Sequence, residues 1–220
     1  MALRHPHPER ERFFKARRIR VSACFCPACG HRLDGFEDFQ CPSCQFTGSD
    51  SLRWFPFQAP ALERISDHTH RLTRSEYQKI DSAITAFERK FPQFALAFVS
   101  VDLPPNTSLR VFAFWLLNAS PCADSHAEAR RSWTILLVAS TSGEWALAPG
   151  YSAEAWLDAR DWQTLLTRVE NLSNQKSLAH AVVGFTRDCR TCLQEAWLKT
   201  QKRLSSRSAR RSKNTAGPPP

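Results

Sequence analysis

Long apolar runs are missing from this chain of 220 residues, and none approaches the ~18 residues that a helix needs to span a bilayer. The first twenty residues, MALRHPHPERERFFKARRIR, have no apolar centre of the kind that directs export. Hydrophobic residues nevertheless make up 42% of the chain, which is the balance of a globular protein. We therefore expect a cytoplasmic globular protein with no membrane span.

Glycine is also sparse, with seven residues in all, and none of the usual glycine motifs occurs. G-x-x-x-x-G-K-[ST] and G-x-G-x-x-G, which cradle phosphates, are absent, as is the G-x-S-x-G turn that exposes a catalytic serine. The common nucleotide-binding folds and the α/β-hydrolases therefore lack their signatures here.

Acidic residues are missing from the end of the chain. Residues 199–220 contain seven Lys and Arg and no acid, and residues 1–23 contain seven Lys and Arg and two Glu. The remaining sixteen bases and nineteen acids leave the body slightly acidic, although the whole chain carries +9. We expect a basic arm over 1–21 and a disordered, Ser-, Arg- and Pro-rich tail over 201–220. Such tails keep a protein soluble, or contact nucleic acid or anionic surfaces weakly and without sequence preference.

Cysteine, by contrast, is concentrated near the start of the chain. Five of the eight cysteines lie in CFCPACGHRLDGFEDFQCPSCQFTG, which runs from Cys24 to Gly48. Two C-x-x-C pairs stand eleven residues apart, Cys26 with Cys29 and Cys41 with Cys44. This spacing is typical of a zinc ribbon, in which two tight turns present four thiolates to one Zn²⁺ in a tetrahedron.

Four cysteines close the coordination sphere, so the pattern predicts a structural Zn²⁺ site with no open position for a substrate. Cys24 precedes the first pair too closely to share its turn, and we place it outside the metal shell. His31 is an alternative ligand that a complete set of four cysteines makes unnecessary. A pair of disulfides is the other interpretation, and an expected cytoplasmic location argues against it.

The body of the chain alternates helical and strand patterns. A linker over 49–61, whose prolines disfavour regular structure, leads to a domain over 62–200. Three- and four-residue apolar spacing indicates helices, and short apolar runs indicate buried strands. We expect helices over 74–91, 107–118, 152–172 and 175–204, with strands over 94–101, 133–140 and 144–150. A break before Asp161 is the alternative for the helix over 152–172 and would split it in two. The last two strands, joined at Ser142-Gly143, have the pattern of a hairpin.

Part of this body resembles a known family. Its elements are Asp67, the helix start at Leu72-Thr73, an A-x-x-L-L-N helix ending at Asn118, the LLVA strand and Gly150-Tyr151 with Glu154. Over about residues 65–172 they are similar to the TPM domain of thylakoid-lumen phosphatase-like proteins and levamisole-receptor modulators. The resemblance implies an α/β/α sandwich preceded here by the zinc ribbon over 22–48. The chain departs from the family where NASPCADSHAEARRS follows the second helix and GYSAE replaces GYGLE.

The same resemblance implies a second cation site, because phosphatase activity and divalent-metal binding are attributed to some plant members. The candidate ligands for Ca²⁺ or Mg²⁺ are Asp67, Asp102, Glu154 and Asp158. Asp102 follows a strand, and Glu154 and Asp158 would share a helix face. In the alternative interpretation, Asp102 caps a turn and the other two favour the positive end of their helix.

Three functions remain open at this point. The first is a non-catalytic binding or regulatory protein with an unknown protein partner, and the second is a metal-dependent phosphatase-like hydrolase. The third is a nucleic-acid-associated protein that uses the ribbon and the basic tails. Two further cysteine patterns predict no site: Cys189 and Cys192 fall within a helix, and Cys122 and His126 share one loop.

Overall fold

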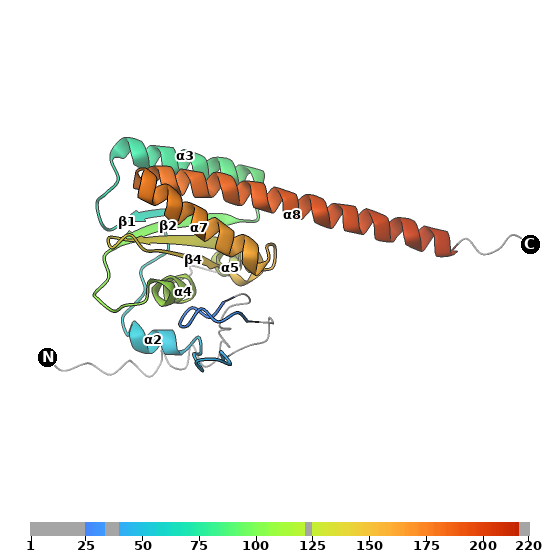
Figure 1. Cartoon of the computed structure of the whole chain (residues 1–220). Helices are drawn as coiled ribbons and strands as arrows, with labels where there is room; N and C mark the ends of the chain where they lie inside the picture. Colours follow the sequence, from blue (N-terminus) through green and yellow to red (C-terminus); the bar gives the residue numbers. More distant parts are fainter. Residues whose placement is uncertain (1–24, 34–39, 122–124, 216–220) are drawn as a thin grey trace, which may run out of the picture.

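The computed structural model describes residues 25–33, 40–121 and 125–215 (Figure 1). Its elements are, in order, α2 (Asp50–Trp54), β1 (Ile65–Asp67), α3 (Arg74–Lys90), β2 (Ala95–Val101), α4 (Leu109–Ala119), α5 (Ser125–Ser132), β3 (Thr134–Ser140), β4 (Trp145–Pro149), α6 (Tyr151–Glu154), α7 (Ala159–Gln175) and α8 (Leu178–Thr215). A capping box starts α3: Thr73 accepts from the Glu76 N–H, and the Glu76 carboxylate accepts from the Thr73 N–H.

The four strands form one sheet in the order β1-β2-β3-β4. The first three strands are parallel, and β4 returns antiparallel to β3, with Ala139 opposite Trp145 and Ile135 opposite Pro149. The hairpin expected over 133–150 is therefore confirmed, and it leaves β4 at one edge of the sheet.

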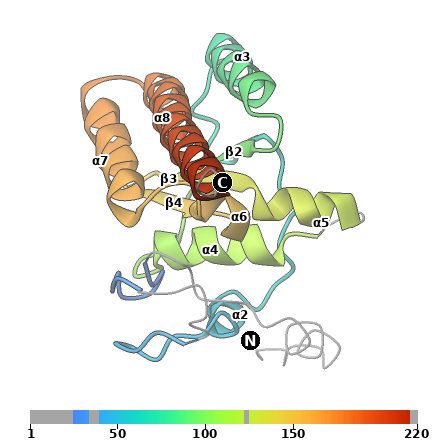
Figure 2. The same ribbon diagram turned by 90° about the vertical axis from the view of Figure 1, so that its right-hand side faces the viewer.

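Helices cover both faces of the sheet, as the α/β/α prediction requires (Figure 1). Successive side chains of a strand point to opposite faces: in β2, Leu96 and Phe98 pack toward α3, α7 and α8, whereas Ala97 and Val99 pack toward α4. Figure 2 shows α7, α8 and α3 side by side above the strands, with α4 beneath them. The α/β/α sandwich is thus confirmed.

Helix α4 is buried around most of its circumference, including Val111 to Leu117 without a break. A helix that is apolar on all sides needs cover on all sides. The sheet covers one side, and the segment from the cysteine turns through Phe55 covers the other. We call residues 25–33 and 40–48 the clip. Phe46 of the clip packs edge-on against Phe114, with ring centroids 6.0 Å apart.

Several local features were not predicted. The linker over 49–61 contains the short helix α2 ahead of its prolines. Its Phe55 is buried against Phe112 and Trp115, which docks the linker on the sandwich. The short strand β1 forms where we expected none, because it pairs with β2. Helix α5 occupies part of the expected loop after α4.

The two C-terminal helices also differ from their expected bounds. The helix expected over 152–172 is broken after α6, because Asp158 caps a new helix by accepting from the Arg160 and Asp161 N–H groups. Helix α8 continues to Thr215, well past residue 204, and so takes in most of the tail that we expected to be disordered.

Candidate metal centre and the groove beside it

The four cysteines of the two C-x-x-C pairs converge at one point. Their Sγ atoms all lie within 4.8 Å of one another, and the Cys26–Cys44 and Cys29–Cys41 sulfur distances are both 3.7 Å. A tetrahedron with metal–sulfur bonds of ~2.3 Å has sulfur–sulfur edges of about 3.8 Å. The spacing therefore fits a four-thiolate metal site, and it is far from the ~2.05 Å of a disulfide.

Two matching turns position these thiols. The Gly30 N–H donates to the Cys26 carbonyl in the first turn, and the Gln45 N–H donates to the Cys41 carbonyl in the second. Gly30 and Gln45 both adopt positive φ, at 75° and 62°. The two turns thus share a left-handed residue after the second cysteine, which is Gly30 in the first turn and Gln45 in the second.

The thiols have different environments. Burial raises the pKa of Cys26 to about 12, whereas a hydrogen bond from the His31 backbone lowers the pKa of the exposed Cys29 to about 6. A buried thiolate needs a nearby positive charge, and a divalent cation held by all four sulfurs provides it. The residues present therefore fit a metal, and the donor set alone does not identify which one.

The clip is seated on the start of α4. Gly30 lies close to the end of the Arg110 side chain, since a Cβ at Gly30 would be 2.7 Å from its guanidinium. The Arg110 side chain can move, so the preference for glycine here comes from the positive φ. Together with Phe46, this contact fixes the metal site against the outer face of the sandwich.

The acids proposed for a second cation divide between the two ends of the sheet. Asp67 is the last residue of β1, and Asp102 directly follows β2. These two strands are adjacent and parallel, so both acids lie at the same end of the sheet, which is the carboxyl end of its parallel strands. Burial acts to raise the Asp67 pKa, but hydrogen bonds from Ser100, the Leu72 N–H and Thr69 outweigh it and lower the pKa below its usual value. Asp102 accepts from the Thr141 hydroxyl.

Glu154 and Asp158 lie at the opposite end. The Gly150 N–H, at the end of β4, donates to the Thr134 carbonyl at the start of β3. Glu154 follows within one turn and is therefore about 20 Å from the carboxyl edge along a strand of this length. Asp158 caps α7 and does not share a helix with Glu154. The structure does not bring the four acids together, because a hairpin returns the chain to the edge where β3 began.

Among the described residues, only the four clip cysteines form a group of three or more potential ligands. Cys189 is fully buried and Cys192 half-buried on α8. Cys24 and Cys122 lie outside the described residues. Over the same described part, no helix has both the length and the apolar character needed to cross a membrane.

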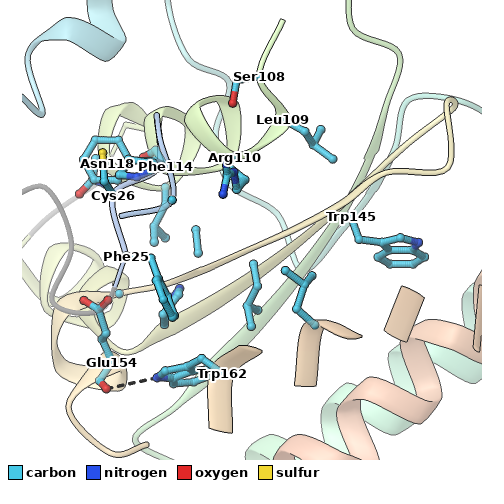
Figure 3. A pocket seen from close by; sticks show the side chains of 18 of the residues that line it. Phe25, Cys26, Ser108, Leu109, Arg110, Phe114, Asn118, Trp145, Glu154 and Trp162 are labelled. Atoms are coloured by element: carbon cyan, nitrogen blue, oxygen red, sulfur yellow. Dashed lines mark hydrogen bonds between the residues drawn. The ribbon is translucent and has the colours of Figure 1, made fainter. Parts of the chain in front are cut away.

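A groove of about 850 Å³ runs beside the clip and along β4. It takes in the strand from Glu144 to Gly150, with Phe114 and Leu117 of α4 on one side and Trp162 and Leu166 of α7 on the other. Phe25, Cys26, Pro27 and Gly30 of the clip line it as well. In Figure 3 Phe25 lies between the α4 side chains and the pair formed by Trp162 and the Glu154 carbonyl.

The outer edge of β4 faces this groove. Ser140 and Glu144, and likewise Thr134 and Gly150, are hydrogen-bonded pairs of the hairpin. Pairs alternate in an antiparallel ladder, so the backbone groups of Trp145 and Leu147 point outward. No strand of the described residues pairs with that edge.

The groove carries more acid than base. Four glutamates line it, at positions 128, 144, 154 and 170, with two arginines, at 110 and 131. Gly150 allows the chain to turn there, since a Cβ would lie 2.4 Å from the Arg131 carbonyl. This groove was not predictable from the sequence, because its walls come from elements that only the sheet order brings together.

Comparisons with known proteins give the fold no family name. No protein-family model matches the chain, and no curated protein matches it. Among solved structures, the N-terminal domain of the cg2496 protein from Corynebacterium glutamicum is similar at a TM-score of 0.47 and 12% identity, covering 59% of this chain and 78% of that one. The BA42 protein from Bizionia argentinensis is similar at 0.47 and 11%, covering 57% and 83%. The resemblance to the TPM domain stays a prediction.

Proposed function

We propose that this protein is a non-catalytic binding protein whose clip is held by one structural Zn²⁺ and whose groove binds an extended polypeptide. The observation that carries the proposal is the groove itself, which is lined by every residue from Glu144 to Gly150 except Ala146, along a strand edge with no described partner. A peptide added to an open sheet edge gains backbone hydrogen bonds, and side-chain pockets on either side give it specificity.

Zinc is the metal that suits four thiolates in a closed tetrahedron. Cys26, Cys29, Cys41 and Cys44 would hold it, and its contribution would be to fix the clip. The clip forms part of the groove wall through Cys26 and Gly30, so metal binding and peptide binding should be linked.

The outward N–H of Leu147 offers a specific test. Proline at this position removes one donor on the open side, where an edge strand tolerates it, whereas Leu147→Ala keeps the donor and shortens the side chain. A displayed library of short peptides should yield binders to the wild-type protein. We expect Leu147→Pro to bind the selected peptides at least ~10-fold more weakly, and Leu147→Ala to bind them at closer to wild-type strength.

Thermal unfolding and zinc content should be measured for both variants, so that a loss of folding is recognised. The proposal fails if no peptide is selected, or if a folded Leu147→Pro protein binds as tightly as wild type.

The phosphatase-like alternative has less support. Its acids lie at opposite ends of the sheet, and no observation on the described residues favours a shared cation. A turnover assay with a generic phosphate ester and Mg²⁺ or Ca²⁺ would revive it only if activity depended on Asp102, as shown with Asp102→Ala.

A further inference from the structure

The open edge of β4 lacks the features that usually keep an edge strand from pairing with another chain. Native edge strands are very short, carry charged side chains, or are covered by another segment. The strand β4 has five residues, Trp145 to Pro149, without a charge, and its proline comes only at the end. The other edge strand of the sheet, β1, has three residues. We therefore expect β4 to be covered in the folded protein.

The walls on either side of this edge are apolar. The side chain of Leu147 packs with α7 and α8, whereas Ala148 packs with α4. A strand added to the edge would continue this alternation, so its side chains would meet the two walls in turn. The apolar residues of the walls are Trp162 and Leu166 on α7, and Phe114 and Leu117 on α4. The segment that covers β4 should therefore be extended and should carry apolar side chains at alternate positions.

The chain itself brings a segment to this place. The described part of the structure begins at Phe25, and Phe25 lines the groove, as Figure 3 shows. Six residues of extended chain cover about 20 Å, and β4 spans about 13 Å from Trp145 to Pro149. The few residues that directly precede Phe25 are thus long enough to follow the whole edge.

The sequence of those residues has the pattern of a strand. Residues 19–25 read Ile-Arg-Val-Ser-Ala-Cys-Phe, with apolar side chains at every second position. Ile19 and Val21 are β-branched, which favours extended structure. Side chains two residues apart share one face of an extended chain. Ile19, Val21 and Ala23 would therefore lie on the same face as Phe25, whose side chain lines the groove.

We propose that residues 19–24 pair as an additional strand with the outer edge of β4, and so occupy the groove until another ligand displaces them. The inference rests on the proposed function, because it takes the groove to be a peptide site and names the first peptide bound there. A tethered segment has an effective concentration of the order of mM, so even a weak contact keeps the groove occupied. An external ligand must compete with it and should share its alternating apolar pattern.

Amide exchange in the wild-type protein tests the pairing directly. The N–H groups of Trp145 and Leu147 point away from β3, whereas those of Ala146 and Ala148 point toward it. We expect the Leu147 amide of the free protein to exchange within ~10-fold of the Ala146 rate, because both are then hydrogen-bonded in the sheet. A Leu147 amide that exchanges like an exposed one overturns the proposal without the need for a variant.

Two double variants of the full chain separate the apolar face from the basic one. Ile19→Ser with Val21→Ser removes the apolar side chains, and Arg18→Ser with Arg20→Ser is the matched control on the other face. The first should raise the Leu147 exchange rate at least ~10-fold and leave Ala146 unchanged. The control should change neither rate. Equal effects of the two variants would assign the contact to charge and refute the pairing, and circular dichroism with zinc analysis shows that both proteins are folded.

Competition with external peptides distinguishes this inference from the proposed function. Peptides selected on the wild-type protein should bind the Ile19→Ser, Val21→Ser protein at least ~10-fold more tightly, because no tethered segment has to be displaced. Equal binding overturns the inference and leaves the peptide-binding function standing. Protection of Leu147 that the variant abolishes, without any external peptide being selected, supports the inference and refutes the function.

A second copy of the chain is the other candidate to supply the segment. Protection of the Leu147 amide that falls on dilution, together with a dimer in sedimentation velocity, would mean that residues 19–24 of one copy cover β4 of another. That result would refute pairing within one chain. We expect the same protection at all protein concentrations.

Discussion

Removal of the metal should unfold the clip while leaving the sandwich folded. Within the described residues, the clip has two isolated β-bridges, Phe25–Arg32 and Gln40–Thr47. Apart from its cysteines, its large buried apolar side chains are Leu33 and Phe46. The four thiolates are therefore its main source of stability, and either a chelator or Cys41→Ser should remove that source.

The magnitudes favour unfolding of the clip. Burial of two side chains of this size stabilises by about 3–6 kcal/mol in total, and ordering the backbone costs ~1–2 kcal/mol per residue. About six residues of ordered backbone are enough to cancel the gain, and the clip is longer than that. Binding of structural zinc contributes about 10–16 kcal/mol to the folding free energy of small zinc domains. Since Phe46 also covers Phe114 of α4, we expect the sandwich to lose up to about 3–6 kcal/mol of unfolding free energy.

Four measurements check this expectation. Metal analysis should give one zinc per chain, and cobalt substitution should give the absorption spectrum of a tetrahedral cobalt–thiolate centre. Amide hydrogen exchange should show loss of protection in the clip after chelation, with protection retained in β2 and β3. Urea unfolding should give the loss of stability. Cys192→Ser, a half-buried cysteine away from the cluster, serves as the matched control and should keep its metal.

The reasoning would be refuted by a fully metal-free protein whose clip amides remain protected. A Cys41→Ser protein with undiminished zinc would also refute it, since the site would then not need all four sulfurs.

Three further substitutions test the sandwich. Ile84→Ala, in a fully buried position of α3, should lower the unfolding free energy by about 2–5 kcal/mol in urea titrations, and a change below 1 kcal/mol would contradict the packing of that face. Thr73→Ala removes the cap of α3 and should cost ~1 kcal/mol, whereas Ser75→Ala beside it should cost little. The Asp67 pKa is lowered in the folded protein, so its carboxylate stabilises above the unfolded pKa of about 3.9 and this stabilisation is lost as the pH falls through the folded pKa. Asp67→Asn should therefore be less stable than wild type at pH 7, with a gap that narrows in acid; a gap independent of pH would contradict the assignment.

Apolar periodicity was enough to predict most of the sandwich. The helices α3 and α4 and the strands β2, β3 and β4 each carry a local pattern that depends little on the rest of the chain. The strand β1 carries no such pattern, because Ile65–Asp67 is a strand only through its pairing with β2. The break after α6 was signalled by Asp158, whose side chain caps the next helix.

The two candidate cation sites differ in how far the sequence could predict them. Each C-x-x-C pair sits on a turn that short-range hydrogen bonds determine, so spacing alone predicts the cysteine cluster. The four acids required knowledge of which end of the sheet each one occupies. The hairpin predicted over 133–150 already implied that Glu154 returns to the edge where β3 starts, opposite Asp102. The prediction that the four acids share one site failed because each acid lies near a strand end, but the two ends of a sheet are far apart.

The main structural role of the clip is to cover the outer side of α4, and the metal site is secondary to that role. A helix buried from Val111 to Leu117 needs cover on its far side, because Phe114 and Trp115 would otherwise be exposed. Phe46 and Phe55 cover those rings, and they come from the segment that we divided between a ribbon over 22–48 and a linker over 49–61. One apolar cluster joins both to the sheet. A metal bound by the four cysteines would therefore stabilise a part of the sandwich's own core, and the clip and linker complete the fold that the domain over 62–200 begins.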